Sequence, residues 1–411
     1  MATETKFEIF SYRWVVLIMF ILTAIMTQVV WITFAPMTNE FALFFFGNAE
    51  QSSLNLIFLL SMVFMIAYIP VNYFACKLID NFGLKWGTGI GVMLTGVFGF
   101  ARAIWPNYWA VLVFQILCAL GQPFVLNSFT KLAVNWFPEK EKTLATGLGT
   151  MSVLLGPVIA MVVPMLAIGV NLTVLLYGYG GAGLFTMILY LVFVKDKPSS
   201  PPNAYSDKTK VFETKGTLGM FKRKDFLLLF ALMFIGIGVF NAISTGIDTI
   251  FEVTGIPGGL TKDDVIGFIG GIMIFGGIIG AIVLSTLSDK FRKRKIFLIL
   301  ALATSAIFTI LFFFITNFIA LMIIALFFGF FLISALPVGL TLAAEMTYPL
   351  PEETSNGWLM WGGQISGILL ILGVLFMGDY IKYNFIIYLV LFVLGTVGSF
   401  FLKDVDAYEI K

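Results

Sequence analysis

Twelve long apolar runs set the strongest limit on what this chain can fold into. Each has about the 20 residues that an α-helix needs to cross the hydrocarbon core of a bilayer. The runs are 13–36, 54–76, 86–104, 108–133, 143–168, 172–194, 225–251, 264–287, 296–315, 317–346, 355–377 and 381–402. Hydrophobic residues make up 59% of the chain and charged residues 12%, so its expected solvent is lipid. The pattern predicts an all-α membrane protein with twelve transmembrane helices.

The residue types on which most enzyme chemistry depends are scarce. The chain has no histidine, which removes the commonest general base and the commonest transition-metal ligand. Its two cysteines, Cys76 and Cys118, fall in separate apolar runs and form neither a disulfide framework nor a CxxC metal site. We therefore expect no enzyme activity, no cofactor and no bound metal. The basic residues are loop charges, so they do not indicate a nucleic-acid partner.

The positions of Lys and Arg predict the orientation. With the N-terminus in the cytoplasm, only Arg102, Lys262 and Lys382 fall on the outer side, and the other basic residues lie on the cytoplasmic side. We expect both termini to be cytoplasmic in a multi-pass protein of the plasma membrane. The Pro-, Ser- and Lys-rich segment after the sixth run is typical of a solvated linker. The expected domains are a bundle at 1–194, a linker at 195–224 and a second bundle at 225–411.

Two short loops suggest an internal repeat. The stretch "CKLIDNFGLKWG" begins at residue 76, and "STLSDKFRKRKI" begins at residue 285. Aligning Asp80 with Asp289 pairs Lys85 with Arg294, and both pairs are 209 residues apart. Each loop joins the second and third runs of its own half. A chance match between two basic loops is the alternative, but the six-plus-six layout favours two pseudo-symmetric six-helix bundles around a central cavity.

The first loop resembles the signature loop of the major facilitator superfamily, G-x-x-x-D-[RK]-x-G-[RK]-[RK]. Asp80, Gly83 and Lys85 match it, whereas Cys76 and Asn81 depart from it. Gly83 permits the positive φ of a tight turn. The resemblance implies the major facilitator fold and a loop that holds the cytoplasmic side shut.

The resemblance also implies a cytoplasmic gate shared by both halves. We expect Asp80 to face the start of the eleventh run, where Thr354 or Ser355 is the expected N-cap. Asp289, Arg294 and Glu345 are the expected gating residues of the second half.

Several stretches resemble a narrower group, the feline leukaemia virus subgroup C receptor-related transporters. They are "VVWITFAPM", "CALGQPFVLN", "GVFNAISTGID" and "AAEMTYPLPEETSNG" followed by "GGQISGI". Members of that group move choline and ethanolamine, and haem export has also been ascribed to them. The resemblance implies an aromatic cage in which ring faces attract a weakly hydrated cation.

The residues of the implied binding site can be compared one by one. Trp31 matches the tryptophan of the cage, but Asn241 replaces its tyrosine, and Val153 and Leu154 replace two amides. Gln28 lies one turn before Trp31 and shares its helix face. The candidate substrate-binding residues are Gln28, Trp31, Gln122, Phe240, Asn241 and Gln364.

Two charged residues lie inside or near the ends of apolar runs. Asp248 is a candidate cation or proton site, and the alternative is a solvated carboxylate at the outer mouth. Arg102 is expected to snorkel to the outer interface, with contact to a substrate anion as the alternative.

The sequence therefore predicts a secondary transporter that works by rocker-switch alternating access. The expected substrate is a small organic solute such as an amine or zwitterion, coupled to a proton or sodium gradient or to none. The alternatives are a receptor or sensor that binds without transport, and a transporter of an organic anion or haem-like compound.

Overall fold

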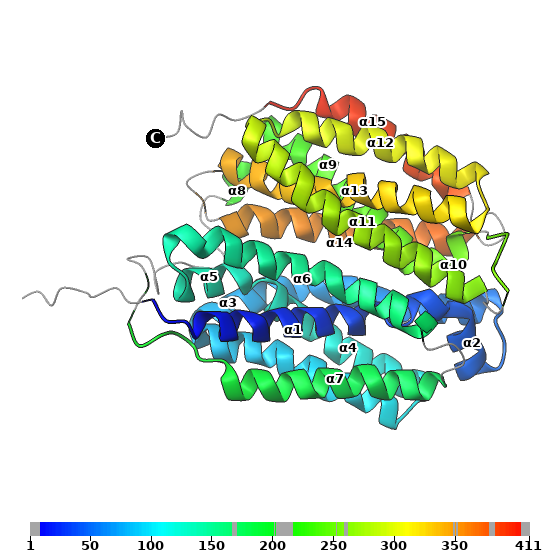
Figure 1. Ribbon diagram of the computed structural model, residues 1–411, viewed down its shortest axis with the longest axis horizontal. Coiled ribbons are helices and arrows are strands. Elements are labelled where there is room, and N and C mark those ends of the chain that lie inside the picture. The colour runs from blue at the N-terminus through cyan, green and yellow to red at the C-terminus, as the bar shows by residue number, and fades with distance from the viewer. Residues whose placement is uncertain are drawn as a thin grey trace, which may run out of the picture. The chain divides into compact units, whose positions relative to one another are not determined.

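The computed structural model describes residues 9–166, 171–200, 202, 217–251, 253–258, 262–347, 350, 352–377 and 383–403. Across these residues the regular elements are helices, apart from one isolated bridge between Thr254 and Asn317 (Figure 1). The helices are α1 (Arg13–Ile32), η1 (Ala35–Met37), α2 (Thr38–Phe46), α3 (Gln51–Ile104), α4 (Tyr108–Leu126), α5 (Phe129–Trp136), α6 (Glu139–Leu166), α7 (Leu172–Phe193), α8 (Thr217–Met220), α9 (Lys224–Thr245), α10 (Ile247–Ile250), α11 (Lys262–Phe291), α12 (Lys295–Phe314), α13 (Phe318–Thr347), α14 (Glu352–Met377) and α15 (Asn384–Ser399). The predicted all-α class is confirmed.

The helices match the predicted membrane spans. Ten segments of the described chain are long and apolar enough to cross a bilayer. One of them, α3, has 54 residues and a non-helical Gly83 with φ 79° and ψ 179°, so it contains two spans joined by the signature loop. The shorter apolar α15 completes the set of twelve runs. The seventh run differs from its prediction, because α9 ends at Thr245 and α10 follows a break at Gly246.

The chain divides into two compact units. Unit 1 comprises Met1–Trp31, Pro70–Gly156 and Thr173–Glu213. Unit 2 comprises Ile32–Ile69, Pro157–Leu172 and Thr214–Lys411. Unit 2 thus combines the C-terminal half with parts of the first, second and fifth predicted spans. The division into 1–194, 195–224 and 225–411 stays a prediction, and much of its linker lies outside the described residues.

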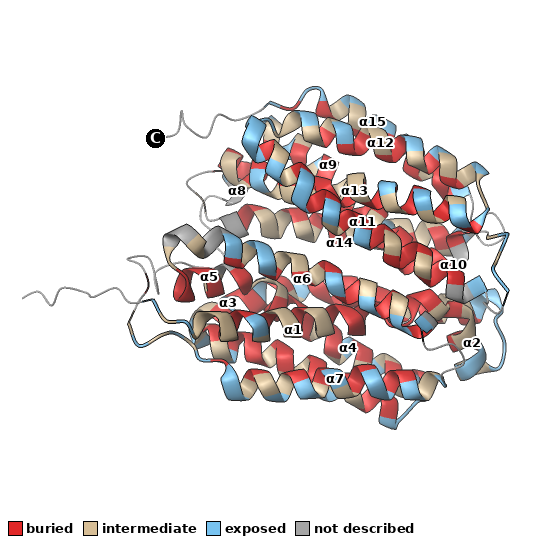
Figure 2. Cartoon of the chain, in the orientation of Figure 1, coloured by how far each residue is buried: buried red, intermediate tan, exposed pale blue. Residues whose placement is uncertain are grey.

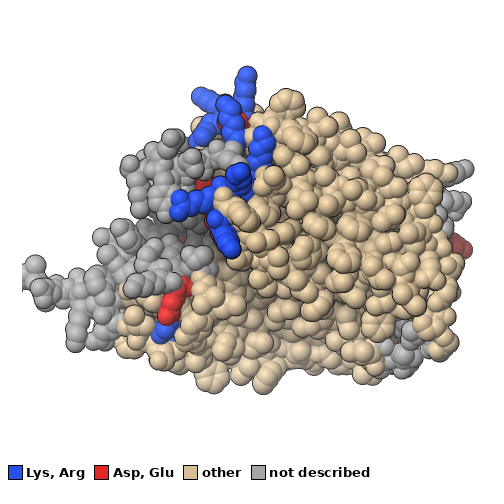
Figure 3. Space-filling view, turned by 45° about the horizontal axis from the view of Figure 1, so that its top comes forward, with Lys and Arg blue, Asp and Glu red and all other residues tan. Residues whose placement is uncertain are grey.

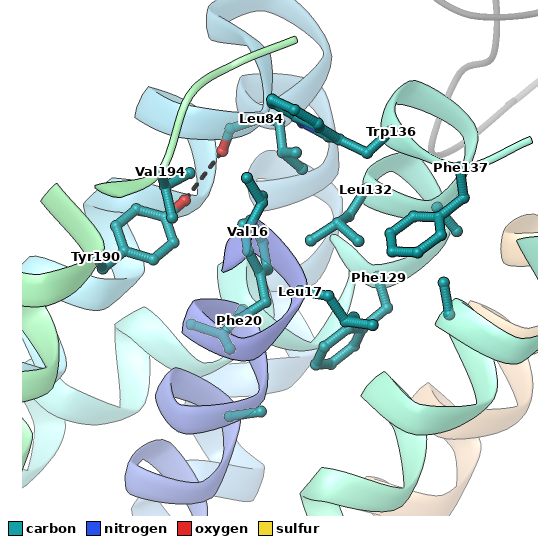
Figure 4. Packing of buried hydrophobic residues seen from close by; sticks show 14 of the residues in the cluster. Val16, Leu17, Phe20, Leu84, Phe129, Leu132, Trp136, Phe137, Tyr190 and Val194 are labelled. Atoms are coloured by element: carbon teal, nitrogen blue, oxygen red, sulfur yellow. Dashed lines mark hydrogen bonds between the residues drawn. The ribbon is translucent and has the colours of Figure 1, made fainter. Parts of the chain in front are cut away.

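A cluster of buried side chains joins six helices of unit 1, α1 and α3 to α7. Val16, Leu17 and Phe20 of α1 pack with Leu84 of α3, with Phe129, Leu132 and Trp136 of α5, and with Tyr190 of α7 (Figure 4). The ring centroids of Phe20 and Tyr190 are 5.3 Å apart. Since lipid tails are as apolar as leucine, such contacts stabilise a membrane protein through close packing. The cluster lies beside the signature loop and anchors it.

Small residues bring the helices of unit 2 close together. A Cβ on Gly276 or Gly280 of α11 would meet backbone atoms of α13, and one on Gly329 of α13 would meet the backbone of α11. Figure 1 shows α11 and α13 running beside each other. Glycines also allow α14 to pack closely on α9, where Gly363 and Gly367 face side chains of α9. Small residues at such contacts are typical of helix packing in membranes.

The surface is apolar over wide areas. Large hydrophobic side chains such as Phe185, Phe314 and Phe401 are exposed, and exposed positions recur along the outer faces of α7 and α12 (Figure 2). In the view of Figure 3, Lys and Arg side chains gather toward one end of the described surface, next to a broad uncharged face. An exposed apolar band next to clustered cations is the surface expected of an integral membrane protein.

Candidate functional site

Three of the six candidate substrate-binding residues are buried in unit 1. Gln28 and Trp31 lie one turn apart near the end of α1. Gln28 lies so close to Gly156 of α6 that a Cβ added at Gly156 would collide with its side chain. Trp31 is 7% exposed, and its indole Nε1 is buried without a hydrogen-bond partner among the described residues. Gln122 lies on α4, buried. The Trp31 indole N–H therefore stays available for a hydrogen bond.

Arg102 and Gln115 hold the end of α1 in place. The helix ends at Ile32, so the carbonyl of Val30 is among those that no N–H of the same helix can reach. Arg102 Nη1 donates to this carbonyl at 3.3 Å and Gln115 Nε2 donates to it at 3.1 Å. Arg102 Nη1 also donates to Gln115 Oε1 at 2.6 Å.

The position of Arg102 contradicts the expectation of a snorkelling side chain, because its exposed fraction is 0%. Arg102 is buried because its guanidinium is attracted to the C-terminal end of α1, where the last carbonyls and the negative end of the helix dipole lie. Arg102 and Gln115 come from α3 and α4, 13 residues apart, and no pattern in the sequence connects them with Trp31.

The other three candidate residues lie in unit 2. Asn241 of α9 faces Gly367 of α14, and its Nδ2 is buried without a partner in the described part of the chain. Gln364 lies three residues before Gly367, so it shares the α14 face that meets Asn241. Phe240 is half-buried beside Asn241. Asn241 thus lies at the α9–α14 contact, and Gln364 lies about one turn before this contact on α14.

Asn241 begins a buried polar stripe along α9 and α10. Its other members are Ser244, Thr245 and Asp248, and each has a polar atom that is buried and lacks a hydrogen-bond partner among the residues described. Asn241 is three residues before Ser244 and four before Thr245, which places these three on neighbouring positions of one face of α9. Asp248 follows beyond the break at Gly246. Buried polar atoms without partners are rare in folded proteins, so this stripe is a candidate for ligand contact.

Asp248 joins two segments of unit 2. Its Oδ2 accepts hydrogen bonds from Asn39 Nδ2 at 2.8 Å and from Asn39 N at 3.3 Å. Asp248 is 1% exposed, which does not agree with the alternative of a solvated carboxylate. The two residues are 209 apart, the offset that relates Asp80 to Asp289. Asn39 and Asp248 are therefore equivalent positions of the repeat that meet each other. The shared offset is a signal from which the sequence could have identified Asn39.

The stability of the protein is expected to depend on the protonation of Asp248. Burial raises the pKa of this carboxyl from 3.8 to about 6, and Lys262 and the hydrogen bonds from Asn39 only partly oppose the shift. Asp248 lies beyond Thr245, where the membrane span ends. Besides Asp248, the acidic residue Glu40 of α2 also lies next to Asn39, which it follows in the chain. Because the folded-state pKa is raised, the carboxyl's contribution to stability is full below pH 3.8 and is lost as pH rises through about 6.

Thermal unfolding of the purified protein between pH 8 and 4 measures this effect. We expect Asp248→Asn to remove a stabilisation on acidification of up to about 3 kcal/mol, the equivalent of two pKa units. The exposed carboxylate Glu50 offers a control, Glu50→Gln, that should keep the wild-type pH profile. A wild-type profile in Asp248→Asn would contradict the expectation.

The predicted gating residues of unit 1 have partners that sequence reasoning missed. Asp80 accepts a hydrogen bond from Lys131 Nζ of α5 at 2.9 Å. The backbone N of Lys85 donates to Asp196 Oδ1 at 3.1 Å. The expected contact between Asp80 and the start of the eleventh span stays a prediction. The expected N-cap is wrong, because α14 begins at Glu352 and Thr354 and Ser355 lie in its first turn.

The gating residues of unit 2 form one ion-pair group. Arg294 binds Asp289, and its Nη2 lies 3.0 Å from Glu345 Oε1 of α13. Burial opposes the charged form of Arg294, but the hydrogen bonds that it donates to Glu345 and Asp289 outweigh this effect and raise its pKa. Arg292 has a φ of 53°, and it lies 209 residues after Gly83, which has a φ of 79°. The repeat therefore extends to a positive φ at the same place in both loops.

Replacing Gly83 by alanine is expected to destabilise the signature loop by about 1 to 3 kcal/mol, because its φ of 79° and ψ of 179° fall in a backbone region that is essentially restricted to glycine. The added methyl would also collide with the Asp196 carboxylate. The melting temperature of the purified variant measures the effect. Gly178→Ala is the control, since a Cβ at Gly178 of α7 meets nothing within 4 Å. Equal melting temperatures for the two variants would refute the expectation.

Comparison with known proteins agrees with this architecture. The family model described as Major Facilitator Superfamily matches residues 16–262 and 260–409. Solute carrier family 49 member A3 of Xenopus tropicalis is 30% identical over 386 residues, covering 89% of this chain and 78% of that protein. The choline/ethanolamine transporter FLVCR1 of Felis catus is 28% identical, and the match covers 87% of this chain and 66% of that protein.

Solved structures resemble the fold as well. The D-xylose-proton symporter has a TM-score of 0.75 at 15% sequence identity, with 97% of this chain and 99% of that chain covered. A bacterial homologue of the human lysosomal transporter Spinster has a TM-score of 0.70 at 14% identity, with 95% and 96% covered. At these identities the likeness concerns the two-domain fold alone.

Proposed function

The chain belongs to the Major Facilitator Superfamily, and we propose that it is a secondary transporter for a small organic amine or zwitterion in the cytoplasmic membrane. The family and the named relatives are transporters rather than enzymes. Its apolar helices make it an integral multi-pass membrane protein.

The main support for a solute-binding site comes from buried polar atoms that have no hydrogen-bond partner among the described residues. The indole Nε1 of Trp31 and the amide Nδ2 of Asn241 are buried without partners among the described residues. Both atoms are N–H donors, and leaving such a donor unsatisfied costs about 1 to 3 kcal/mol, which an acceptor oxygen of a bound solute or of water recovers. We assign Trp31 as the ring that attracts a cationic head group. Gln28, Gln122, Asn241 and Gln364 are the groups that we expect to orient its polar part, with Phe240 as an apolar contact.

Alternating access requires contacts that break in turn, and candidates exist in both units. On the expected cytoplasmic side, these are the Asp80–Lys131 pair and the Arg294–Asp289–Glu345 group. On the expected outer side, Asn39 and Asp248 join segments from the two halves of the sequence within unit 2. The proposed cycle opens one set while the other is closed.

A thermal-shift screen of the purified protein tests the substrate class. A ligand that binds only the folded state raises its apparent stability by RT ln(1 + [L]/Kd). The panel contains choline, ethanolamine, other amines, zwitterions, organic anions and haem. We expect saturable stabilisation by an amine or zwitterion. Stabilisation by an organic anion or haem alone would contradict the proposed substrate class.

A further inference from the structure

Three residues with buried side-chain oxygens flank the break between α9 and α10 along the chain. Ser244, Thr245 and Asp248 are 0%, 1% and 1% exposed. The hydroxyl oxygens of the first two and Oδ1 of the third have no hydrogen-bond partner among the residues that the structure describes. Gly246 interrupts the helix between them, with φ −99° and ψ 16°. The three side chains therefore belong to one short, irregular segment.

Two buried hydroxyls of α12, also in unit 2, behave differently. Thr309 of α12 is also 1% exposed, and its Oγ1 donates to the carbonyl of Ser305, four residues earlier, at 2.7 Å. Ser305 makes the same bond to Ala301 at 2.7 Å. This bond is the usual way in which a helical hydroxyl is satisfied. Ser244 and Thr245 make no such bond, so their oxygens are available to a ligand.

The charge at this break is negative. The last carbonyls of α9 point along the helix toward its C-terminal end, where the helix dipole is negative. The Asp248 carboxylate adds a full charge, with Oδ2 held by Asn39 and Oδ1 left without a partner among the described residues. The exposed Lys262 attracts this carboxylate but compensates the buried charge only in part, and a bound cation would complete the compensation. Interrupted helices in transporters hold Na⁺ with unwound carbonyls and helix C-terminal ends.

We propose that the α9–α10 break is a sodium site formed by Ser244, Thr245 and Asp248. Hydroxyl, carboxylate and carbonyl oxygens are hard ligands, which suit hard cations. One carboxylate balances one positive charge, which favours a monovalent ion. Glu40 of α2, next to Asn39, also has a buried Oε2 without a partner in the described chain, so Ca²⁺ is the competitor to be tested. The role of the ion as a coupling ion rests on the proposed function, whereas its binding does not.

The test is a thermal-shift titration without organic solute. In the main titration, K⁺ is replaced by Na⁺ at constant total chloride and at a constant pH slightly above neutral. Two separate titrations add CaCl₂ or lower the pH. We expect a saturable rise in melting temperature with Na⁺ over K⁺. Thr245→Val and Asp248→Asn should weaken apparent Na⁺ affinity by about tenfold or more, as loss of a metal-site residue does. Thr309→Val, a buried threonine of equal exposure, should leave it unchanged.

Four outcomes would overturn the proposal. They are no difference between Na⁺ and K⁺, a larger shift with Ca²⁺, a shift that follows pH alone, or unchanged Na⁺ affinity in Thr245→Val. If a variant does not fold, Ser244→Ala replaces it with the smallest change in volume. Failure of sodium binding would leave the solute screen valid, and failure of the screen would leave the sodium result valid.

Discussion

Replacing Trp31 by alanine is expected to weaken solute binding by about 30-fold. The physical reason is the loss of a desolvated cation–π contact, worth about 2 kcal/mol, at tenfold in affinity per 1.4 kcal/mol. Trp31→Phe keeps a ring face and should retain part of the affinity. Both variants are measured by the concentration of the stabilising amine that gives a half-maximal thermal shift.

The control for this prediction is Trp109→Ala, which removes an indole of α4 that is 64% exposed. It should leave solute affinity at the wild-type value. If Trp31→Ala bound the solute as tightly as Trp109→Ala, Trp31 would have no part in the site. A melting curve of Trp31→Ala without solute separates loss of binding from loss of folding, because a destabilised but folded variant still melts cooperatively.

Replacing Arg102 by leucine is expected to destabilise the protein by about 3 kcal/mol or more. The guanidinium donates to Gln115 and to the Val30 carbonyl, and hydrogen bonds from charged groups are worth about 1.5 to 3 kcal/mol each. Arg102→Lys keeps the charge but loses the planar fork of donors, so it should recover only part of the stability. Thermal unfolding in detergent measures the three proteins.

A surface residue of the same helix provides the control for Arg102. Lys77→Leu removes an exposed cation of α3 and should change the melting temperature little. Because Arg102 holds the end of α1 that carries Trp31, Arg102→Lys should also weaken solute binding while the protein stays folded. A melting temperature for Arg102→Leu equal to that of Lys77→Leu would contradict the assigned role.

The sequence predicted those features that depend on local pattern. Apolar runs of about 20 residues predicted the helices, because crossing a bilayer requires that length. Gly83 predicted a positive φ, and the structure has it. The offset of 209 residues predicted a repeat, and it reappears in the backbone of Gly83 and Arg292 and in the contact between Asn39 and Asp248.

Features that depend on distant partners could not be predicted in this way. Lys131 is 51 residues from Asp80, and nothing in a short loop indicates which helix will pack beside it. Arg102 was expected at the interface, since its burial depends on where α1 ends. The break at Gly246 was hidden inside the apolar run 225–251, because hydropathy does not distinguish one continuous helix from two. Asn39 lies outside the two loops that carry the repeat signal, so the loops alone do not indicate it.

Flux through the purified protein tests the central claim most directly. The protein is reconstituted into liposomes, and uptake of labelled ethanolamine and choline, together with any other solute that stabilises it, is followed over time. The account predicts saturable uptake that Trp31→Ala reduces and Trp109→Ala does not. Saturable binding of the same solute without any uptake would contradict it, and would identify the protein as a receptor built on a transporter fold.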